Sequence, residues 1–144
     1  MSEPINIYST DRNGFEKLSN MFNGPIQLGS KTFPTVEHMY QYHKAKFACD
    51  TESMDKILNA ETGWDVWKLA KKIKGLESTL WDGVAYEALK FCMELAFNQN
   101  PKQKKLLLKT EDRLLLHKSP KGYSLGRWEQ DFPEILMNIR EKLQ

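Results

Sequence analysis

Residues 31–47, KTFPTVEHMYQYHKAKF, restrict the fold most, because a run of strand-forming residues leads directly into a helical pattern. Pro34 ends the run, since it lacks the N–H that a sheet requires, and Thr35 is a good N-cap for a helix beginning at Val36. Residues expected on the buried face then recur at i, i+3, i+4, i+7 and i+11, namely Val36, Met39, Tyr40, His43 and Phe47. A strand joined to an amphipathic helix in this way favours an α+β fold.

Strand and helix patterns recur along the rest of the chain. Short β-prone runs bounded by turn residues predict strands at residues 5–8, 25–28, 31–33 and 113–116. Helical periodicity predicts helices at residues 36–47, 52–61, 65–73, 82–99, 102–110 and 132–143. Repeats and linkers are missing from the sequence. Residues 1–144 are therefore predicted to form a single α+β domain, mostly helical with a small β-sheet.

Individual residues define the expected ends and faces of these helices. Thr51 and Asp82 are expected to cap the helices that follow them, and Pro133 is expected in the first turn of the last helix. Five apolar residues of the longest helix are expected to face the core, namely Val84, Ala88, Phe91, Cys92 and Leu95.

The composition argues against several classes of protein. Lys and Arg total 21 and Asp and Glu total 19, so the chain lacks the strong positive charge typical of nucleic-acid-binding domains. No apolar run approaches the length of a membrane span, and the N-terminus has no signal-peptide pattern. Cys49 and Cys92 lie far apart, so we expect reduced thiols in a cytoplasmic protein. The Cys and His spacing fits no zinc site, and no metal is expected.

A polar row within residues 36–47 is the first candidate for a functional site. Glu37, Gln41 and Lys44 recur at i, i+4 and i+7, beside the aromatic face. Helix pairing and the helix dipole can explain this row as a solvated flank, because Glu37 stands in the first turn. The alternative is one wall of a site, where Glu37 acts on an electron-poor centre and Lys44 contacts an anionic or carbonyl group. The spacing alone does not decide between them.

Two further candidates lie in the second half of the chain. Trp81 precedes a predicted helix, where an indole is usually part of the core, although it can also support a heteroaromatic ring. Residues 122–128, GYSLGRW, combine turn glycines with Arg127 and Trp128. This composition suits a phosphate-binding loop and a simple surface loop equally well.

Motifs along the first third of the chain follow one another in a fixed order. A strand ends in Tyr8-Ser9, an L-S-N-M-F loop covers residues 18–22, and K-T-F-P-T-V-E-H is followed by Gln41 and Lys44. In this order and spacing they resemble the NADAR superfamily, which includes the YbiA-like N-glycosidases. A weaker similarity extends to the ending L-M-x-x-R-x-x-L at residues 136–143, so the resemblance covers nearly the whole chain.

This resemblance implies a compact α+β domain that hydrolyses N-glycosidic bonds of ribose. The implied substrates are small phosphoribosyl or ADP-ribosyl conjugates of a nucleobase-like ring, including ADP-ribosylated nucleic acid. No cofactor is implied. Glu37 would be the essential carboxylate and Trp81 the residue that lines the base. Asn20, Gln41 and Lys44 would be neighbouring pocket residues.

The chemistry of such a bond suggests what these side chains would do. Breaking a ribosyl C–N bond develops positive charge on the sugar, which a carboxylate can stabilise while an acid assists the departing base. A desolvated lysine, Lys44 or Lys31, could instead attack the anomeric carbon and form a Schiff base. Arg127, next to Trp128, is the candidate for a phosphate contact.

The sequence departs from the family pattern at three places. Gly29-Ser30 stands where relatives usually have Asp-Gly, and Ser78 stands where they often have arginine. Residues 125–128 are shorter than the W-G-x-G segment in which some members carry a catalytic Asp, with Glu129 and Asp131 nearby as substitutes. The alternative function is therefore a non-catalytic module that binds ADP-ribose or a nucleotide and has lost part of the catalytic loop.

Overall fold

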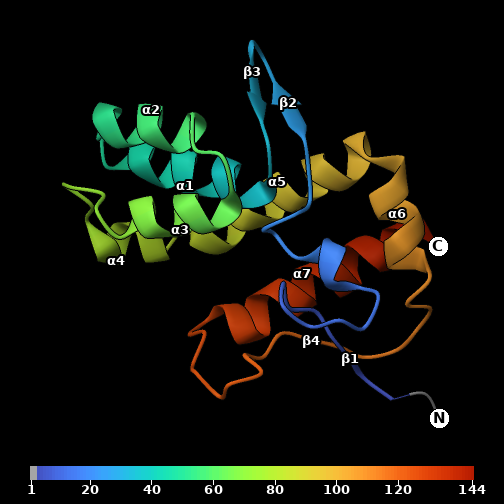
Figure 1. The fold of residues 1–144 in the computed structure, drawn as a ribbon. Helices are drawn as coiled ribbons and strands as arrows, with labels where there is room; N and C mark the ends of the chain where they lie inside the picture. The colour runs from blue at the N-terminus through green and yellow to red at the C-terminus, as the bar shows by residue number, and fades with distance from the viewer. Residues whose placement is uncertain (1–2) are drawn as a thin grey trace.

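The computed structural model describes residues 3–144 and confirms the α+β class (Figure 1). The first two residues of the predicted domain lie outside this description. Its strands are β1 (Ile5–Asn6), β2 (Ile26–Leu28), β3 (Lys31–Phe33) and β4 (Leu115–Leu116), and a 3₁₀ helix, η1, covers Glu16–Leu18. The helices are α1 (Val36–Phe47), α2 (Thr51–Leu58), α3 (Gly63–Ala70), α4 (Ser78–Asp82), α5 (Ala85–Gln99), α6 (Pro101–Leu108) and α7 (Trp128–Leu143). Within the described chain no helix is long and apolar enough to cross a membrane.

The strands form two separate two-stranded sheets. β2 and β3 form the predicted antiparallel hairpin, with Ile26 opposite Phe33, and its turn projects away from the helices in Figure 1. β1 pairs in parallel with β4, although the two strands lie far apart in the sequence. The hydrogen bond from the N–H of Ile7 to the carbonyl of Leu116 (2.8 Å) continues this pairing beyond β1. Both predicted strands are thus present but shorter than expected.

Side-chain caps explain where the first three helices begin. Thr35 caps α1 as predicted and accepts a hydrogen bond from the N–H of His38 (3.2 Å). α2 is capped by Asp50 rather than by Thr51, because the Asp50 carboxylate accepts from the N–H of Ser53 (3.1 Å). α3 begins at Gly63, earlier than predicted, because Thr62 forms a capping box with Asp65.

Two predictions about the later helices are wrong. The helix expected at residues 82–99 begins later, at Ala85, and it is preceded by an unpredicted short helix, α4, which ends at Asp82 with Gly83 after it. Asp82 therefore ends one helix and does not cap the next. Pro133 lies inside α7 rather than in its first turn. The chain is helical from Trp128 onward, and the first turn of α7 carries acidic side chains that suit the positive end of a helix dipole.

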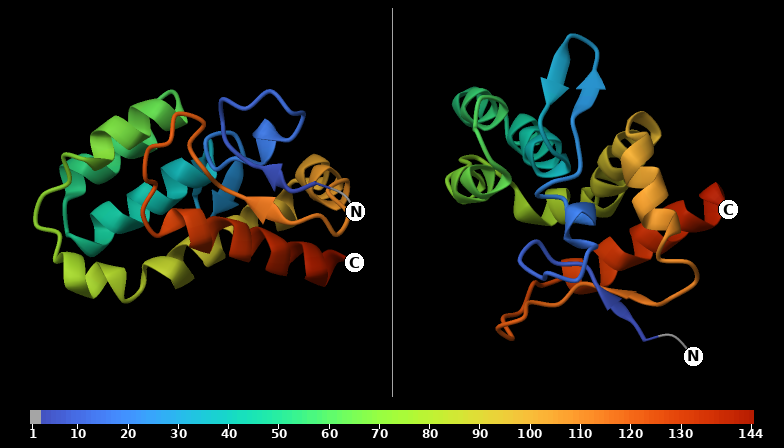
Figure 2. Two further views of the ribbon diagram at one scale, coloured as in Figure 1. Left: turned by 90° about the horizontal axis from the view of Figure 1, so that it is seen from below. Right: turned by 45° about the vertical axis from the view of Figure 1, so that its right-hand side comes forward.

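The core lies around α1, which α2, α3 and α5 all contact. Figures 1 and 2 show α5 between α1 and α7, and α5 contacts both. The buried face of α5 is rotated from the predicted one, since Val84 is 42% exposed and Phe91 is 49% exposed. The residues of α5 that are buried are Ala85, Leu89, Cys92, Met93, Ala96 and Phe97.

Crowding around α1 also buries its polar side chains. His38 is fully buried, with Nδ1 2.8 Å from Thr35 Oγ1 and Nε2 2.9 Å from the carbonyl oxygen of Ala60. Gln41 is 8% exposed, whereas Phe47, predicted to face the core, is 42% exposed at the end of the helix. In the polar row of α1, Gln41 is therefore buried and Glu37 and Lys44 are half-buried, so the row is not a fully solvated flank.

Candidate active site

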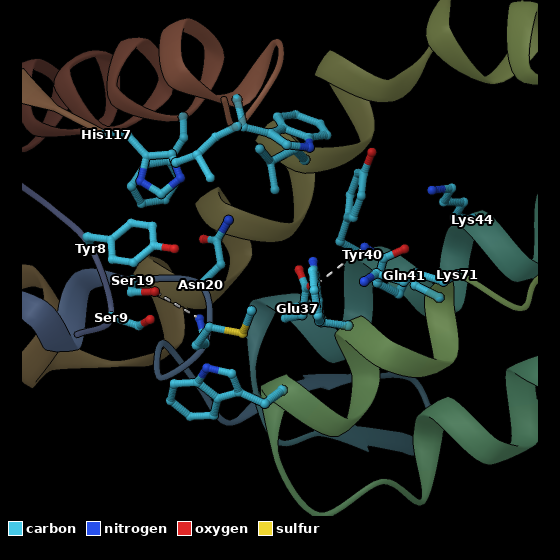
Figure 3. A pocket seen from close by; sticks show the side chains of 18 of the residues that line it. Tyr8, Ser9, Ser19, Asn20, Glu37, Tyr40, Gln41, Lys44, Lys71 and His117 are labelled. Atoms are coloured by element: carbon cyan, nitrogen blue, oxygen red, sulfur yellow. Dashed lines mark hydrogen bonds between the residues drawn. The ribbon is translucent and has the colours of Figure 1, made fainter. Parts of the chain in front are cut away.

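A pocket of about 560 Å³ opens between α1, α3, the loop before the hairpin and the start of α7 (Figure 3). A volume of this size suits a nucleotide-sized ligand. Most of its lining is aromatic or polar. Its aromatic, charged and amide side chains include Tyr8, Asn20, Glu37, Tyr40, Gln41, Lys44, Trp64, Trp67, Lys71, His117 and Trp128.

Glu37 provides the carboxylate of this pocket. Its carboxylate oxygen Oε2 accepts a hydrogen bond from Nε2 of Gln41 (3.3 Å). Burial raises the pKa of Glu37 to about 7, although the Gln41 hydrogen bond and the charge of Lys44 both lower it. The side chain is therefore near its midpoint at neutral pH, where it can both donate and accept a proton.

Two side-chain amide oxygens in the wall of the pocket have no hydrogen-bond partner among the described residues. Within the described chain, Oε1 of Gln41 and Oδ1 of Asn20 are buried and accept no hydrogen bond. A buried acceptor without a partner costs free energy, and a bound donor would relieve that cost. These atoms can accept from ribose hydroxyls or from N–H groups of a base.

The loop that carries Asn20 is fixed on the first turn of α1. The N–H of Glu37 donates to the carbonyl of Asn20 (3.1 Å), and the N–H of Val36 donates to the carbonyl of Asn23 (2.8 Å). Gly24 allows this approach, because a Cβ there would overlap the backbone of Pro34. The L-S-N-M-F loop and the P-T-V-E-H segment thus form one rigid unit.

The aromatic wall is built from Tyr40 and Trp128, whose rings meet edge to face at 5.3 Å between centroids. Tyr40 Oη accepts a hydrogen bond from Nε1 of Trp81 (3.2 Å). Trp81 is 5% exposed and does not line the pocket, and it contacts the site through Tyr40. Burial also raises the pKa of Tyr40, which keeps its hydroxyl neutral.

Lys31 and Arg127 were expected in the site, and the structure places both outside it. Lys31 is exposed on the hairpin, whose strands run away from the pocket. Arg127 donates from Nε to Oδ2 of Asp131 (2.8 Å) and from Nη1 to the carbonyl of Asp82 (3.0 Å). These contacts hold its guanidinium against α4 and α7, behind the Trp128 ring (5.6 Å to the ring centroid), so Arg127 itself does not line the cavity.

The acidic substitutes expected near the shortened loop also lie outside the pocket. Glu129 accepts from the N–H of Leu125 (3.0 Å) and stabilises the loop, while Asp131 pairs with Arg127. Among the described lining residues, Glu37 is the only Asp or Glu. The described chain also contains no cluster of three or more His, Cys, Asp and Glu side chains that could hold a metal ion.

The wall opposite Lys44 was missed by the sequence reasoning. Figure 3 shows Tyr8 and His117 side by side there, with ring centroids 5.7 Å apart. His117 Nδ1 lies 2.8 Å from the carbonyl oxygen of Ile7, so Nδ1 carries the hydrogen and Nε2 is left as an acceptor. Burial lowers the pKa of His117, which favours this neutral form. Tyr8 ends one predicted strand and His117 follows another, and the parallel pairing of those strands is the signal that would have joined them.

Comparisons with known proteins find relatives of this chain. The model of the NADAR domain family matches residues 8–144. A riboflavin biosynthesis protein of Vibrio vulnificus is 29% identical over 150 residues, covering 100% of this chain but only 40% of that protein. The N-glycosidase YbiA of Escherichia coli is 26% identical over 145 residues, with 96% of this chain and 88% of that protein covered.

A viral relative and a solved structure extend the comparison. N-glycosidase R617 of Acanthamoeba polyphaga mimivirus is 26% identical over 128 residues, covering 78% of this chain and 75% of that protein. The NMR structure of E. coli YbiA superimposes with a TM-score of 0.75 at 25% identity, over 99% of this chain and 86% of that one.

Proposed function

The chain belongs to the NADAR domain family, and from that premise we propose that it is an N-glycosidase that cleaves the bond between ribose and a nucleobase-like ring. Relatives that carry the name N-glycosidase support this reaction class. The proposed substrate is a phosphoribosyl or ADP-ribosyl conjugate. The observation that carries the proposal is the buried carboxyl of Glu37, with its raised pKa, inside a nucleotide-sized pocket.

In the proposed reaction one residue performs both proton transfers. Protonated Glu37 gives its proton to the nitrogen bonded to C1′ as the C1′–N bond breaks, and the base leaves with the bonding electron pair. The resulting carboxylate stabilises the positive charge on the sugar. Water then adds to C1′ and returns a proton to Glu37, so the products are free ribose conjugate and free base. A single carboxyl with a pKa near neutrality suits this sequence.

The remaining polar and aromatic groups position the substrate. Oε1 of Gln41 and Oδ1 of Asn20 accept hydrogen bonds from the ribose hydroxyls or from the base. Trp128 and Tyr40 provide flat apolar surface for the leaving ring. Lys44, on the same helix as Glu37, faces the phosphate or the sugar.

Lys44 supports a second route to the same products. Its amine can attack C1′ and displace the base, forming a Schiff base with the opened ribose that water then hydrolyses. Borohydride reduction during turnover distinguishes the routes. A ribose adduct on Lys44 in the wild type, missing from Lys44→Arg, would establish the covalent route, and its absence would leave the direct attack of water.

The reaction is tested with Glu37→Gln, which preserves the size of the side chain and removes its proton chemistry. The variant and the wild type are incubated with phosphoribosylamino-pyrimidines and with an ADP-ribosylated guanine oligonucleotide, and released base is measured. We expect loss of about 100-fold or more in rate. Glu52→Gln, on the exposed face of α2, is the matched control. Equal release by wild type and Glu37→Gln would refute the proposed function of Glu37.

A non-catalytic nucleotide-binding module is the second candidate, and one observation favours it. Glu37 is the only acidic side chain in the described pocket lining, whereas most glycosidases use two carboxyl groups. Calorimetry with ADP-ribose, combined with the release assay, separates the candidates. Binding without release of base from any of these substrates would favour the module.

A further inference from the structure

α3 presents two tryptophans at the mouth of the pocket. Trp64 and Trp67 both line the pocket, yet they remain 39% and 47% exposed. Lys71 also lines it, and its Nζ lies 3.4 Å from the centroid of the Trp67 ring. Two neighbouring exposed tryptophans are typical of a surface that binds another molecule. The mechanism proposed above uses none of these three residues.

The tryptophans are held in place by the structure around α3. The capping box of Thr62 and Asp65 fixes the start of the helix. Gly63 packs against Met21 so closely that a Cβ would lie 2.7 Å from its sulfur atom. The Trp64 ring meets Phe22 edge to face at 5.4 Å. The first turn of α3 is thus joined to the same loop that positions Asn20.

The two sides of the pocket differ in charge. Figure 3 shows Lys44 and Lys71 on one side, Tyr8 and His117 on the opposite side, and Glu37 between them. If Glu37 marks the bond that is cleaved, the phosphates of a ribosyl substrate fit the side with the two lysines. Trp67 lies at that side, because Lys71 rests on its ring.

We propose that Trp64, Trp67 and Lys71 form a second recognition subsite, which binds the planar ring and phosphate of an additional nucleotide unit linked to the reacting ribosyl group. The subsite rests on the proposed function of the pocket. An indole face stacks on any nucleobase, and an adjacent ammonium pairs with phosphate while keeping its contact with the ring. The subsite would favour substrates with two rings over simple phosphoribosyl compounds.

Two kinds of molecule carry this chemistry. The additional ring can be the second nucleoside of a dinucleotide-like substrate, or the neighbouring base in a single-stranded nucleic acid. Both present a purine or pyrimidine separated from the reacting ribose by phosphate. The same residues would recognise either, so the test includes one probe for each.

The test is calorimetric and needs no turnover. Kd is measured for ADP-ribose, for ribose 5-phosphate and for a four-nucleotide single-stranded DNA. We expect ADP-ribose or the oligonucleotide to bind about 10-fold or more tightly than ribose 5-phosphate. Trp67→Ala and Lys71→Ala should each remove much of that advantage, and Trp67→Ala should leave the binding of ribose 5-phosphate unchanged. A preference for ADP-ribose or for the oligonucleotide identifies the source of the second ring.

Matched controls lie on exposed surface outside the pocket. Phe91→Ala removes an aromatic ring of similar exposure from α5, and Lys72→Ala removes the lysine next to Lys71. Neither should change any Kd. If Trp67→Ala fails to fold, Trp67→Leu and Lys71→Ala carry the test.

Two results would overturn the subsite. One is equal binding of all three probes by the wild type, including binding of none. The other is a preference that survives Trp67→Ala and Lys71→Ala. A wild type that shows the preference but releases no base would support the subsite and refute the hydrolase, so the two proposals fail separately.

Discussion

The carboxyl of Glu37 joins catalysis and stability at the scale of a single residue. Its pKa is raised from 4.5 to about 7, so the folded protein holds a proton that the unfolded chain releases. Folding stability therefore falls as pH rises from about 4.5 to about 7. Glu37→Gln should be more stable than the wild type above pH 7, by about 1–3 kcal/mol, and equal to it below pH 4. Urea unfolding at pH 4 and pH 8 measures the difference.

Glu52→Gln is the control for this pH dependence, because Glu52 is exposed and pairs only with Lys56. Glu52→Gln should change the free energy of unfolding only slightly, and by the same amount at both pH values. A Glu37→Gln variant less stable than the wild type at pH 8 would contradict the burial of a costly charge.

The second residue-scale prediction concerns Trp81, which supports the site through Tyr40. Trp81→Phe removes the hydrogen bond to Tyr40 Oη and leaves most of the apolar volume. We expect a loss of about 1–2 kcal/mol in the free energy of unfolding, because the buried Tyr40 hydroxyl loses its donor. Substrate affinity should change less than in Trp128→Ala, because Trp128 lines the pocket. Thermal unfolding and KM measured on both variants check this, and a larger KM change in Trp81→Phe would show that Trp81 touches substrate.

Single residues differ in how far the sequence predicts their position. The row of Glu37, Gln41 and Lys44 could be located, because helical spacing puts these residues on one face whatever surrounds the helix. Whether that face was wet or buried depended on which helices pack around α1, and the family resemblance pointed to a site. Lys31 and Arg127 do not line the pocket. The position of Lys31 depends on the direction of a hairpin, and that of Arg127 depends on a local ion pair, which the sequence does not specify.

At the scale of the element, the position of α3 depends on its close approach to the loop at residues 19–23. Gly63→Ala would push Met21 away and tilt the first turn of α3. We expect a loss of about 1–3 kcal/mol from overpacking and a raised KM, because Asn20 and Trp64 move together. Gly83→Ala is the matched control, since its Cβ would meet its nearest neighbour at 3.4 Å, an ordinary contact. If Gly63→Ala and Gly83→Ala changed the free energy of unfolding and KM by the same amounts, this coupling would be contradicted.

Element boundaries were predictable where local chemistry decides them. Thr35, Pro34 and the Gly29-Ser30 turn specify the hairpin and the start of α1 from adjacent residues alone. The short helix α4 was missed, because five residues are too few to show a helical period. The true core face of α5 depends on where α1 and α7 lie, and no local pattern contains that information.

At the scale of the whole molecule, the pairing of β1 with β4 brings the N-terminal segment next to residues 115–116 and builds the wall of Tyr8 and His117. Asn6 stabilises this closure with its side chain. Its Nδ2 donates to Oδ2 of Asp11 (2.7 Å) and to the carbonyl of Lys118 (2.9 Å), and its Oδ1 accepts from the N–H of Lys118 (2.8 Å). The side-chain amide of Asn6 thus joins the segment that carries Tyr8 to the segment that carries His117.

Asn6→Ala should therefore affect the pocket although Asn6 does not line it. We expect a loss of about 1–2 kcal/mol in the free energy of unfolding from the missing hydrogen bonds, and a KM raised more than kcat is lowered. Asn59→Ala, which removes an exposed amide from the end of α2, should change neither kinetic constant. A lower stability with unchanged KM would mean that the wall of Tyr8 and His117 keeps its shape without this closure.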